Sequence, residues 1–384
     1  MRTNNHGAWN APCIIALRYV YSLVRGNCCA NSLSRKRERA RERDVEQKSR
    51  FLNRIDPHPQ PFSRLREKGV ITLLAVTLLV ITSPAWAAGE DKIAVVYPDI
   101  GEPYRAIFEK IVEGIEDRAG SRVVKYAVKP SADSAELKTA LRRQDARMVI
   151  ALGRQGMKAV TPDRGPSAAL GAGMEIVVGG VVTMPESEAR GLSVVSLSPD
   201  PSLLFARLKA LMPAAKRVFV VYDPRYNTWL MRLAREAARA QGLELVAYEV
   251  QDLRGAMQQY QSIFAAADNR TDALWLPQDT TTVEERSVLP VVLQESWRRS
   301  LAIFSSSFGH VRRGVLFTLY PDNVELGKSL AGLALGILAS GNHGGHGMIP
   351  LRDVRIAVNL RTAQHLGLDL SHQQQSFDLV FPEP

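Results

Sequence analysis

Lys92-Ile-Ala-Val-Val-Tyr-Pro-Asp99 and Arg217-Val-Phe-Val-Val-Tyr-Asp-Pro224 are the two stretches that decide the fold of this chain. Each is a short apolar run, rich in β-branched residues, that ends at a proline and an acidic residue. This pattern is typical of a strand buried on both faces. A helical pattern follows each stretch, so we expect two α/β units that begin in the same way.

The two stretches belong to a longer internal repeat. Val95-Val96-Tyr97 and Val220-Val221-Tyr222 lie 125 residues apart. Three further pairs of segments keep this spacing or come within three residues of it: 148–152 with 273–277, 176–178 with 301–303, and 191–200 with 314–322. Four matches in register indicate two copies of one βα unit.

Charge is distributed unevenly along the chain. The formal net charge is +10, but residues 1–69 hold 15 Lys or Arg and 6 acidic residues, whereas the remainder holds 34 basic and 33 acidic residues. A basic face for nucleic acid is therefore not expected on residues 70–384. Cys13, Cys28 and Cys29 also lie in the first 69 residues, so the rest of the chain needs no disulfide.

The N-terminal region reads as a targeting segment preceded by a basic arm. Residues 1–69 contain a charge run and a proline-rich tract, which predicts a disordered arm; either it binds nucleic acid, or it lies upstream of the true translation start, and we favour the second reading. Residues 70–87 join an apolar stretch of twelve to Ala85-Trp-Ala87. This pattern predicts a signal peptide that is cleaved near Ala87, because twelve residues are too few to span a bilayer. No cysteine follows, so no lipid anchor is expected.

From Ala88 onward, strand and helix patterns alternate regularly. The expected strands are 92–97, 123–128, 148–152, 176–182, 192–197, 217–222, 243–250, 273–277, 301–305, 314–319 and 354–359; the expected helices are 102–119, one from 134, 228–241, 255–267, 282–299, 322–338 and 362–366. Such alternation predicts an α/β fold with doubly wound parallel sheets, here in two lobes.

Four segments resemble a known family: Val-Val-Tyr-Asp-Pro224, residues 272–280, residues 326–331 and Val358-Asn-Leu-Arg-Thr-Ala-Gln-His-Leu-Gly-Leu368. Over about 88–384 the chain is similar to the ABC-transporter substrate-binding proteins of the tryptophan and tyrosine type. The resemblance implies the type I periplasmic-binding-protein fold, with three crossover segments near 197–200, 318–321 and 347–351. It assigns 88–198 plus 322–346 to lobe 1, and 199–321 plus 350–384 to lobe 2.

Ligands of open parallel sheets collect beyond the carboxyl ends of the strands. In lobe 1 these ends carry six candidate ligand-binding residues: Tyr97, Asp99, Tyr104, Gly153, Arg154 and Thr183. In lobe 2 they carry eleven: Tyr222, Asp223, Tyr226, Asn227, Gln278, Asp279, Thr280, Ser305, Ser306, Phe308 and Tyr320.

Aromatic rings, carboxylates, an arginine and hydroxyl groups together suit a small zwitterion such as an amino acid. Asp279 or Asp223 would bind its ammonium group, and Arg154 or the backbone of residues 305–307 its carboxylate. Each assignment has a structural alternative. Tyr97 and Tyr222 would pack over the sheet, Asp223 would cap a turn, and residues 278–280 would cap the next helix.

No catalytic constellation is evident. The sequence has no Gly-x-Ser-x-Gly motif, and Gly327-Lys-Ser329 lacks the first glycine of a phosphate loop. We therefore expect a binding protein without cofactor or metal, monomeric and periplasmic, whose partners are a small-molecule ligand and an ABC permease in the inner membrane. Two alternatives stay open: a ligand sensor coupled to a membrane receptor kinase, and an exported enzyme on the same two-lobed scaffold.

Overall fold

The computed structural model describes residues 91–384 except 130–133, 145, 162–173, 342–343 and 383–384. All of them lie in one compact unit, Trp86–Pro384. The expected basic arm and signal peptide fall outside the described residues. Within the described part, no helix has the length and apolar character needed to cross a membrane.

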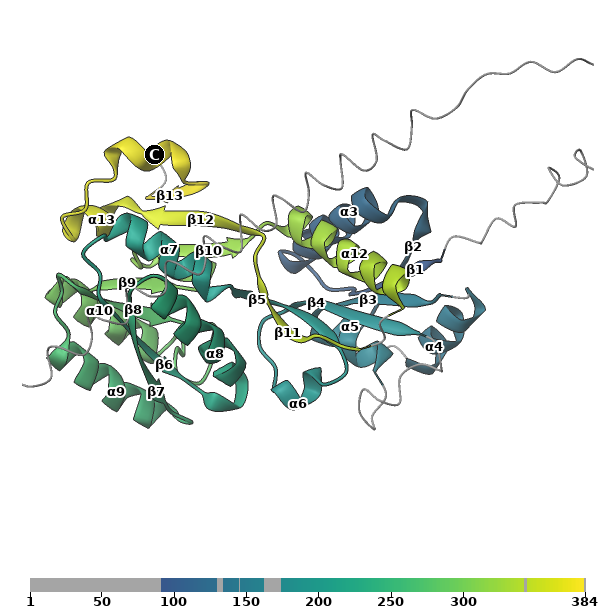
Figure 1. The fold of residues 1–384 in the computed structure, drawn as a ribbon, viewed down its shortest axis with the longest axis horizontal. Coiled ribbons are helices and arrows are strands. Elements are labelled where there is room, and N and C mark those ends of the chain that lie inside the picture. The colour runs from purple at the N-terminus through teal and green to yellow at the C-terminus, as the bar shows by residue number, and fades with distance from the viewer. Residues whose placement is uncertain (1–90, 130–133, 145, 162–173, 342–343, 383–384) are drawn as a thin grey trace, which may run out of the picture. The chain divides into compact units, whose positions relative to one another are not determined.

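Two sheets organise this unit (Figure 1). The first sheet has the strand order β11-β5-β4-β3-β1-β2. Its strands are β1 (Ile93–Pro98), β2 (Val123–Val128), β3 (Met148–Leu152), β4 (Glu175–Val181), β5 (Ser193–Pro199) and β11 (Gly347–Leu351); the helices that pack on it or flank it are α3 (Tyr104–Ala119), α4 (Ser134–Arg143), α5 (Gly153–Val160), α6 (Glu186–Ala189) and α12 (Asn323–Ser340).

The second sheet has the order β13-β12-β10-β9-β8-β6-β7. Its strands are β6 (Arg217–Tyr222), β7 (Glu244–Glu249), β8 (Asp272–Leu276), β9 (Ala302–Ser305), β10 (Phe317–Pro321), β12 (Val354–Asn359) and β13 (Leu379–Phe381); its helices are α7 (Pro201–Leu211), α8 (Pro224–Ala240), α9 (Leu253–Ala266), α10 (Val288–Arg299), α11 (Phe308–Arg312) and α13 (Leu360–His365).

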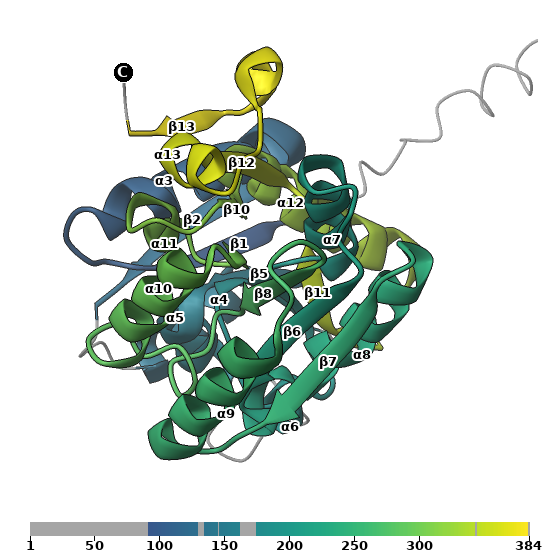
Figure 2. The same ribbon diagram turned by 90° about the vertical axis from the view of Figure 1, so that its left-hand side faces the viewer.

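Both sheets are buried on two faces, as the apolar runs predict. In β1, Ile93 and Val95 enter the core beneath α3 and α12, while Ala94 and Val96 enter the core beneath α4 and α5. The residues of β6 alternate in the same way between a core covered by α7 and α8 and a core covered by α9 and α10. Alternate side chains of a strand point to opposite faces, so an uninterrupted apolar run builds two cores at once. Figure 2 shows helices on both sides of the second sheet.

The internal repeat is visible in the topology. Strands β2-β1-β3-β4-β5 of the first sheet have the same order as β7-β6-β8-β9-β10 of the second. Ile93 pairs with Met148 between β1 and β3, and Val218 pairs with Ala273 between β6 and β8. Each residue is shifted by 125, so the spacing found in the sequence is also the register of the sheets.

The chain passes between the two sheets after β5, after β10 and after β11, and these crossings are bonded to one another. The Asp200 N–H donates to the Leu351 carbonyl at 2.8 Å, and Arg352 pairs with the Asp200 carboxylate at 3.0 Å. The Asp322 N–H donates to the Asp353 carbonyl at 2.9 Å. Three crossovers between two α/β sheets are the arrangement that the resemblance implies.

Several features were not anticipated, among them β13, the short helices α5, α6 and α11, and the three that follow. Gly347–Leu351, expected as a crossover segment, forms β11 and pairs parallel with β5. β10 and β12 are antiparallel, so the second sheet is mixed. Residues 201–211 form helix α7, which the sequence reading omitted; its start is nevertheless marked in the sequence, because Asp200 caps it by accepting the Ser202 N–H and Pro201 is its first residue. The exact division into two lobes stays a prediction.

Helices α3 and α12 cross very closely. A Cβ atom on Gly114 would lie 1.9 Å from the Val324 carbonyl oxygen, and one on Gly327 would lie 2.1 Å from the Ile111 carbonyl oxygen. Neither glycine can therefore be replaced without moving a helix backbone. Gly327, noted in the sequence as part of a partial phosphate-loop match, serves this crossing and lies inside α12.

Candidate functional site

The predicted site residues lie at two places, the carboxyl ends of the parallel strands of each sheet. The first edge consists of the ends of β1, β3 and β4 with the residues that follow them. The second edge consists of the ends of β6, β8 and β9 with the residues that follow them. The two edges are built very differently.

At the first edge, the residues that follow β1 are accessible. Tyr97 is half-buried and packs against the core, and Asp99 lies 3.9 Å from Arg105 in a partly exposed ion pair. Tyr104 begins α3 and is 61% exposed. Ile107 on the same helix and Val182 after β4 are also exposed, at 38% and 43%. The edge thus presents apolar side chains to solvent.

Arg154 and Thr183 lie together at the same edge. The Arg154 guanidinium donates to both oxygens of Glu188, at 3.3 and 2.9 Å, and to the Thr183 carbonyl at 3.4 Å. Gly153 begins α5 with a φ of +68° and has the Phe108 ring beside it. Both members of the Arg154–Glu188 pair are exposed, and such pairs are weak. A ligand carboxylate can therefore compete for Arg154.

At the second edge, Asp279 is 7% exposed and accepts four hydrogen bonds. Its Oδ2 accepts the Asp223 N–H at 2.7 Å and the Asn227 side-chain amide at 2.9 Å. Its Oδ1 accepts the N–H groups of Thr281 and Thr282, at 2.9 and 3.0 Å. One carboxylate thereby joins the end of β6, the start of α8 and the loop after β8. These are the contacts of a residue that organises the loops.

Asp223 is fully buried, and its carboxylate oxygens, like those of Asp279, already accept hydrogen bonds within the protein. It caps α8 by accepting the Arg225 N–H at 3.0 Å, pairs with the Arg225 guanidinium, and accepts the Thr281 hydroxyl at 2.9 Å. Burial by itself would raise the pKa of Asp223, but the hydrogen bonds from Arg225 and Thr281 outweigh burial and hold the pKa below its usual value. Asp223 is therefore ionised at neutral pH, with its charge balanced by Arg225.

Arg225 was not predicted from the sequence, although its position two residues after Asp223 was a usable signal. Its guanidinium lies half-exposed over the Tyr226 ring, 5.7 Å from the ring centre. Asn227 is fully buried, and among the described residues its side-chain oxygen has no hydrogen-bond partner. At the second edge, therefore, the Asn227 side-chain oxygen is an acceptor to which no described residue donates a hydrogen bond.

Tyr222 points away from the second edge. It is 1% exposed, belongs to the core beneath α7 and α8, and its hydroxyl donates to Glu249 at 2.6 Å. Burial, together with the hydrogen bond to Glu249, raises the pKa of Tyr222. Packing, one of the two roles that the sequence left open, accounts for all of these contacts.

The residues after β8 and β9 hold each other in place. The Gln278 side-chain amide donates to the Ser306 carbonyl at 2.9 Å, and the Trp275 indole N–H donates to the Ser306 hydroxyl at 3.0 Å. Ser305 and Ser306 are both buried, whereas Thr280 is exposed. Of these residues, Thr280 and the half-buried Gln278 are the ones with groups that a ligand can reach.

Ser305 also contacts a buried histidine that the sequence reading missed. The Ser305 hydroxyl lies 2.8 Å from His310 Nδ1, donates to the Leu276 carbonyl and accepts the Ser307 N–H. Burial lowers the pKa of His310 to about 4. Although a serine beside a histidine has the composition of a nucleophile and base, this hydroxyl is inaccessible and its hydrogen-bonding capacity is used.

Phe308 and Tyr320 form an aromatic cluster with Phe381. The ring centres of Phe308 and Tyr320 are 4.8 Å apart, and those of Phe308 and Phe381 are 6.2 Å apart. Arg312 lies over both phenylalanine rings. Phe381 comes from the C-terminal strand, and no local pattern connects it to residue 308.

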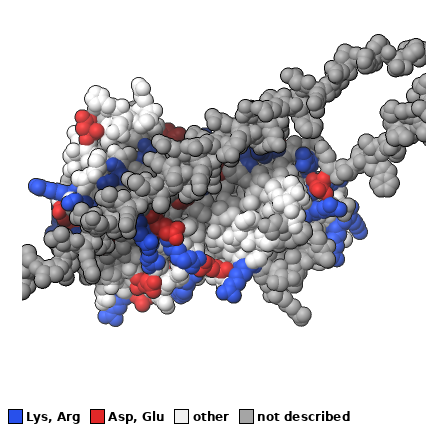
Figure 3. All heavy atoms as spheres, in the orientation of Figure 1, with Lys and Arg blue, Asp and Glu red and all other residues white. Residues whose placement is uncertain are grey.

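The described part of the chain has no cluster of metal ligands, and the face in view has no large patch of one charge. No group of three or more His, Cys, Asp or Glu side chains is placed there to hold a metal ion. Figure 3 shows basic and acidic side chains intermingled on the face in view, without a large patch of one sign. The two edges can offer apolar contact, hydroxyl groups and one exchangeable cation to a small organic ligand.

Several solved structures align with this chain, one of them with a TM-score above 0.5. A substrate binding protein with adhesive properties from Clostridium difficile, in its ligand-free, open structure, aligns with a TM-score of 0.51 and 18% identity over 76% of this chain and 99% of that chain. An ABC domain from Streptococcus pneumonia in complex with L-Trp aligns with a TM-score of 0.48 and 15% identity over 76% and 100% of the two chains. A glucose-galactose binding protein from Geobacillus stearothermophilus aligns with a TM-score of 0.40 and 14% identity over 70% and 97%.

At these identities the similarity concerns the fold, which is that of the type I periplasmic binding proteins. No curated protein matches the sequence. The family model for ABC transporter substrate binding proteins matches residues 179–374, just over half of the chain. The chain therefore belongs to the family of ABC transporter substrate binding proteins.

Proposed function

We propose that the chain is the solute-binding component of an ABC importer. It is exported to the periplasm by a signal peptide cleaved near Ala87 and binds a small organic ligand between two lobes. Residues 88–198 with 322–346 form one lobe, and residues 199–321 with 350–384 form the other. The ligand favours the closed arrangement by contacting both lobes, and the closed form delivers it to a membrane permease.

The observation that supports this proposal best is the difference between the two edges. The first edge exposes Tyr104, Ile107 and Val182, which suit an apolar or aromatic side group. The second edge is a fixed polar surface at which Tyr226, Gln278 and Thr280 keep groups that a ligand can reach. An amino acid, or a similar small carboxylate, matches both: its side group fits the first edge, and its ammonium group supplies a donor to the second.

Among the predicted residues, some meet the ligand directly and others shape the site. Direct contact is proposed for Tyr104, Arg154, Thr183, Tyr226, Gln278 and Thr280. Arg154 takes the carboxylate, in exchange for its weak pair with Glu188. Asp223, Asp279, Ser305 and Ser306 act by holding the loops, because their hydrogen bonds are already made within the protein. The remaining predicted residues are Tyr97, Asp99, Gly153, Phe308 and Tyr320, which border these groups, and Tyr222 and Asn227, which are buried.

A thermal-shift screen of amino acids, small carboxylates and sugars tests the ligand class. A ligand at a hundred times its dissociation constant should add roughly 2.7 kcal/mol to the free energy of unfolding. We expect amino acids or small carboxylates to raise the melting temperature. A shift with sugars alone would overturn the ligand class while leaving the family intact. Sequencing the N-terminus of the exported protein tests the cleavage site, and a mature chain that still began within residues 1–69 would contradict it.

A further inference from the structure

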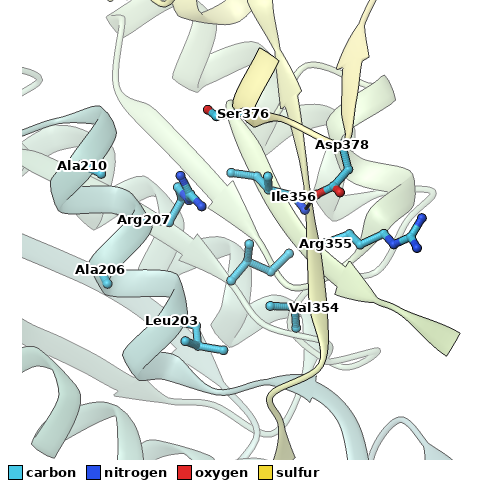
Figure 4. Close-up of a pocket in the computed structure, with 10 residues that line it drawn as sticks. Leu203, Ala206, Arg207, Ala210, Val354, Arg355, Ile356, Ser376 and Asp378 are labelled. Atoms are coloured by element: carbon cyan, nitrogen blue, oxygen red, sulfur yellow. Dashed lines mark hydrogen bonds between the residues drawn. The ribbon is translucent and has the colours of Figure 1, made fainter. Parts of the chain in front are cut away.

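A cavity lies on the second sheet, apart from both edges. It encloses about 320 Å³ between α7, the strands β10 and β12, and residues 376–378 (Figure 4). Pockets for small ligands have volumes of roughly 300–1,000 Å³, so this one has the size for a small molecule. None of the ligand-site residues predicted from the sequence lines it.

The cavity is hollow because of two small residues on α7. Leu203, Ala206, Arg207 and Ala210 have the spacing i, i+3, i+4, i+7 and therefore share one helix face. Ala206 and Ala210 do not reach across to β12, so space remains beneath them. The floor is apolar: Leu319 of β10 and Ile356 of β12 are directly paired across the antiparallel ladder, and both line the cavity.

One cation at this cavity has no partner among the described residues. The Asp378 carboxylate accepts the Ile356 N–H at 2.7 Å, and Arg355 donates to Asp322 at 2.7 Å. Within the ranges that the structure describes, no hydrogen bond or ion pair engages the Arg207 guanidinium. Figure 4 shows its side chain reaching from α7 toward Ile356. A half-buried guanidinium without a partner is a ready site for a carboxylate.

We propose that this cavity binds a small organic carboxylate with an apolar body. The carboxylate pairs with Arg207, and the apolar body fills the space bounded by Leu203, Ala206, Ala210, Leu319 and Ile356. Asp378, at the opposite end, disfavours a second negative charge and so selects monocarboxylates. The site is separate from the one proposed between the lobes and does not depend on it.

Isothermal titration calorimetry with 3-phenylpropionate, on protein purified from cells that express the full sequence, tests the proposal. We expect binding that Arg207→Gln weakens at least tenfold. Ala206→Phe fills the cavity from an exposed helix position and should abolish the same binding without loss of fold, as checked by circular dichroism. Arg239→Gln, an exposed arginine on α8, is the matched control and should leave the affinity unchanged. The amine 3-phenylpropylamine should not bind.

Three outcomes would overturn the proposal. The first is an absence of binding by 3-phenylpropionate. The second is preferential binding of the amine, which would make Asp378 the recognising group. The third is an affinity that Arg207→Gln and Ala206→Phe leave unchanged but Arg154→Gln removes; the carboxylate would then occupy the site between the lobes, and the proposed function would stand.

Discussion

The two edges come from copies of one repeat, yet they differ in how their polar groups are used. At the first edge, Tyr104 and Val182 are exposed and Arg154 holds a solvent-facing partner. At the second edge, Asp223 and Asp279 are buried and every carboxylate oxygen has an internal donor. A shared topology therefore fixes where side chains gather, but burial decides whether they stabilise the fold or remain free for a ligand.

The largest expected effect is that of Asp279→Ala. Its loss leaves the N–H groups of Asp223, Thr281 and Thr282 and the Asn227 amide without their acceptor, and each buried unpaired donor costs about 1–3 kcal/mol. We expect the free energy of unfolding to fall by about 4 kcal/mol, measured by urea unfolding. Asp99→Ala at the first edge is the control and should change it by well under 1 kcal/mol. Similar losses in the two variants would remove the contrast between the edges.

The second effect is a dependence on pH. Because burial lowers the pKa of His310 from 6.5 to about 4, the unfolded chain binds a proton at this histidine before the folded chain does. The stability is fully present above pH 6.5 and is lost as pH falls toward 4, by roughly 3 kcal/mol. Glu285 and Arg313, which face His310 with opposite effects, are included in that pKa. Unfolding curves between pH 7 and pH 4 should show this slope, and His310→Gln should flatten it.

The third effect concerns the pair formed by Trp275 and Ser306. Ser306→Ala leaves the buried indole N–H without an acceptor, so we expect a loss of about 2 kcal/mol. Thr280→Ala, at an exposed position of the same edge, is the control and should cost almost nothing in stability. Equal Tm values for the wild type and Ser306→Ala would mean that the edge is less rigid than its hydrogen bonds indicate.

The smallest effect on stability, with the largest on binding, is expected at the first edge. Arg154→Gln and Glu188→Gln both remove an exposed ion pair and should each lower the free energy of unfolding by less than about 1 kcal/mol. For an amino-acid ligand we expect only Arg154→Gln to weaken binding, at least tenfold. Glu188→Gln frees the guanidinium and should leave binding unchanged or stronger. If both variants bind the ligand as tightly as the wild type does, Arg154 is not the residue that binds the ligand's carboxylate.

The sequence alone would have led to a different expectation for Asp279. Three polar residues after a buried strand favour ligand contact, and on that reading Asp279→Ala weakens binding without unfolding the protein. The four donors around Asp279 come from positions 223, 227, 281 and 282. Two of these lie more than fifty residues away along the chain, so no local pattern could have revealed that the carboxylate is already occupied.

The architecture, by contrast, could be predicted from local sequence patterns. Apolar runs such as 93–98 and 217–222, repeated at an interval of 125, predicted the strands and the duplicated unit, and the same interval appears in the register of β1 and β6 with their neighbours. Burial of both faces of a strand requires an uninterrupted apolar run, and such a run can be recognised in the sequence. The antiparallel direction of β12 and the Phe308–Phe381 contact could not be predicted in this way, because they depend on where the chain returns in space.

The sequence by itself determined the duplicated α/β fold and the edges at which polar residues collect, since hydrophobic periodicity and strand direction are local properties. Only the tertiary structure decided which of those residues are free. Whether a carboxylate binds a ligand or a neighbouring loop depends on the donors that packing brings to it, and the cavity beside Arg207 exists only where α7 meets β12.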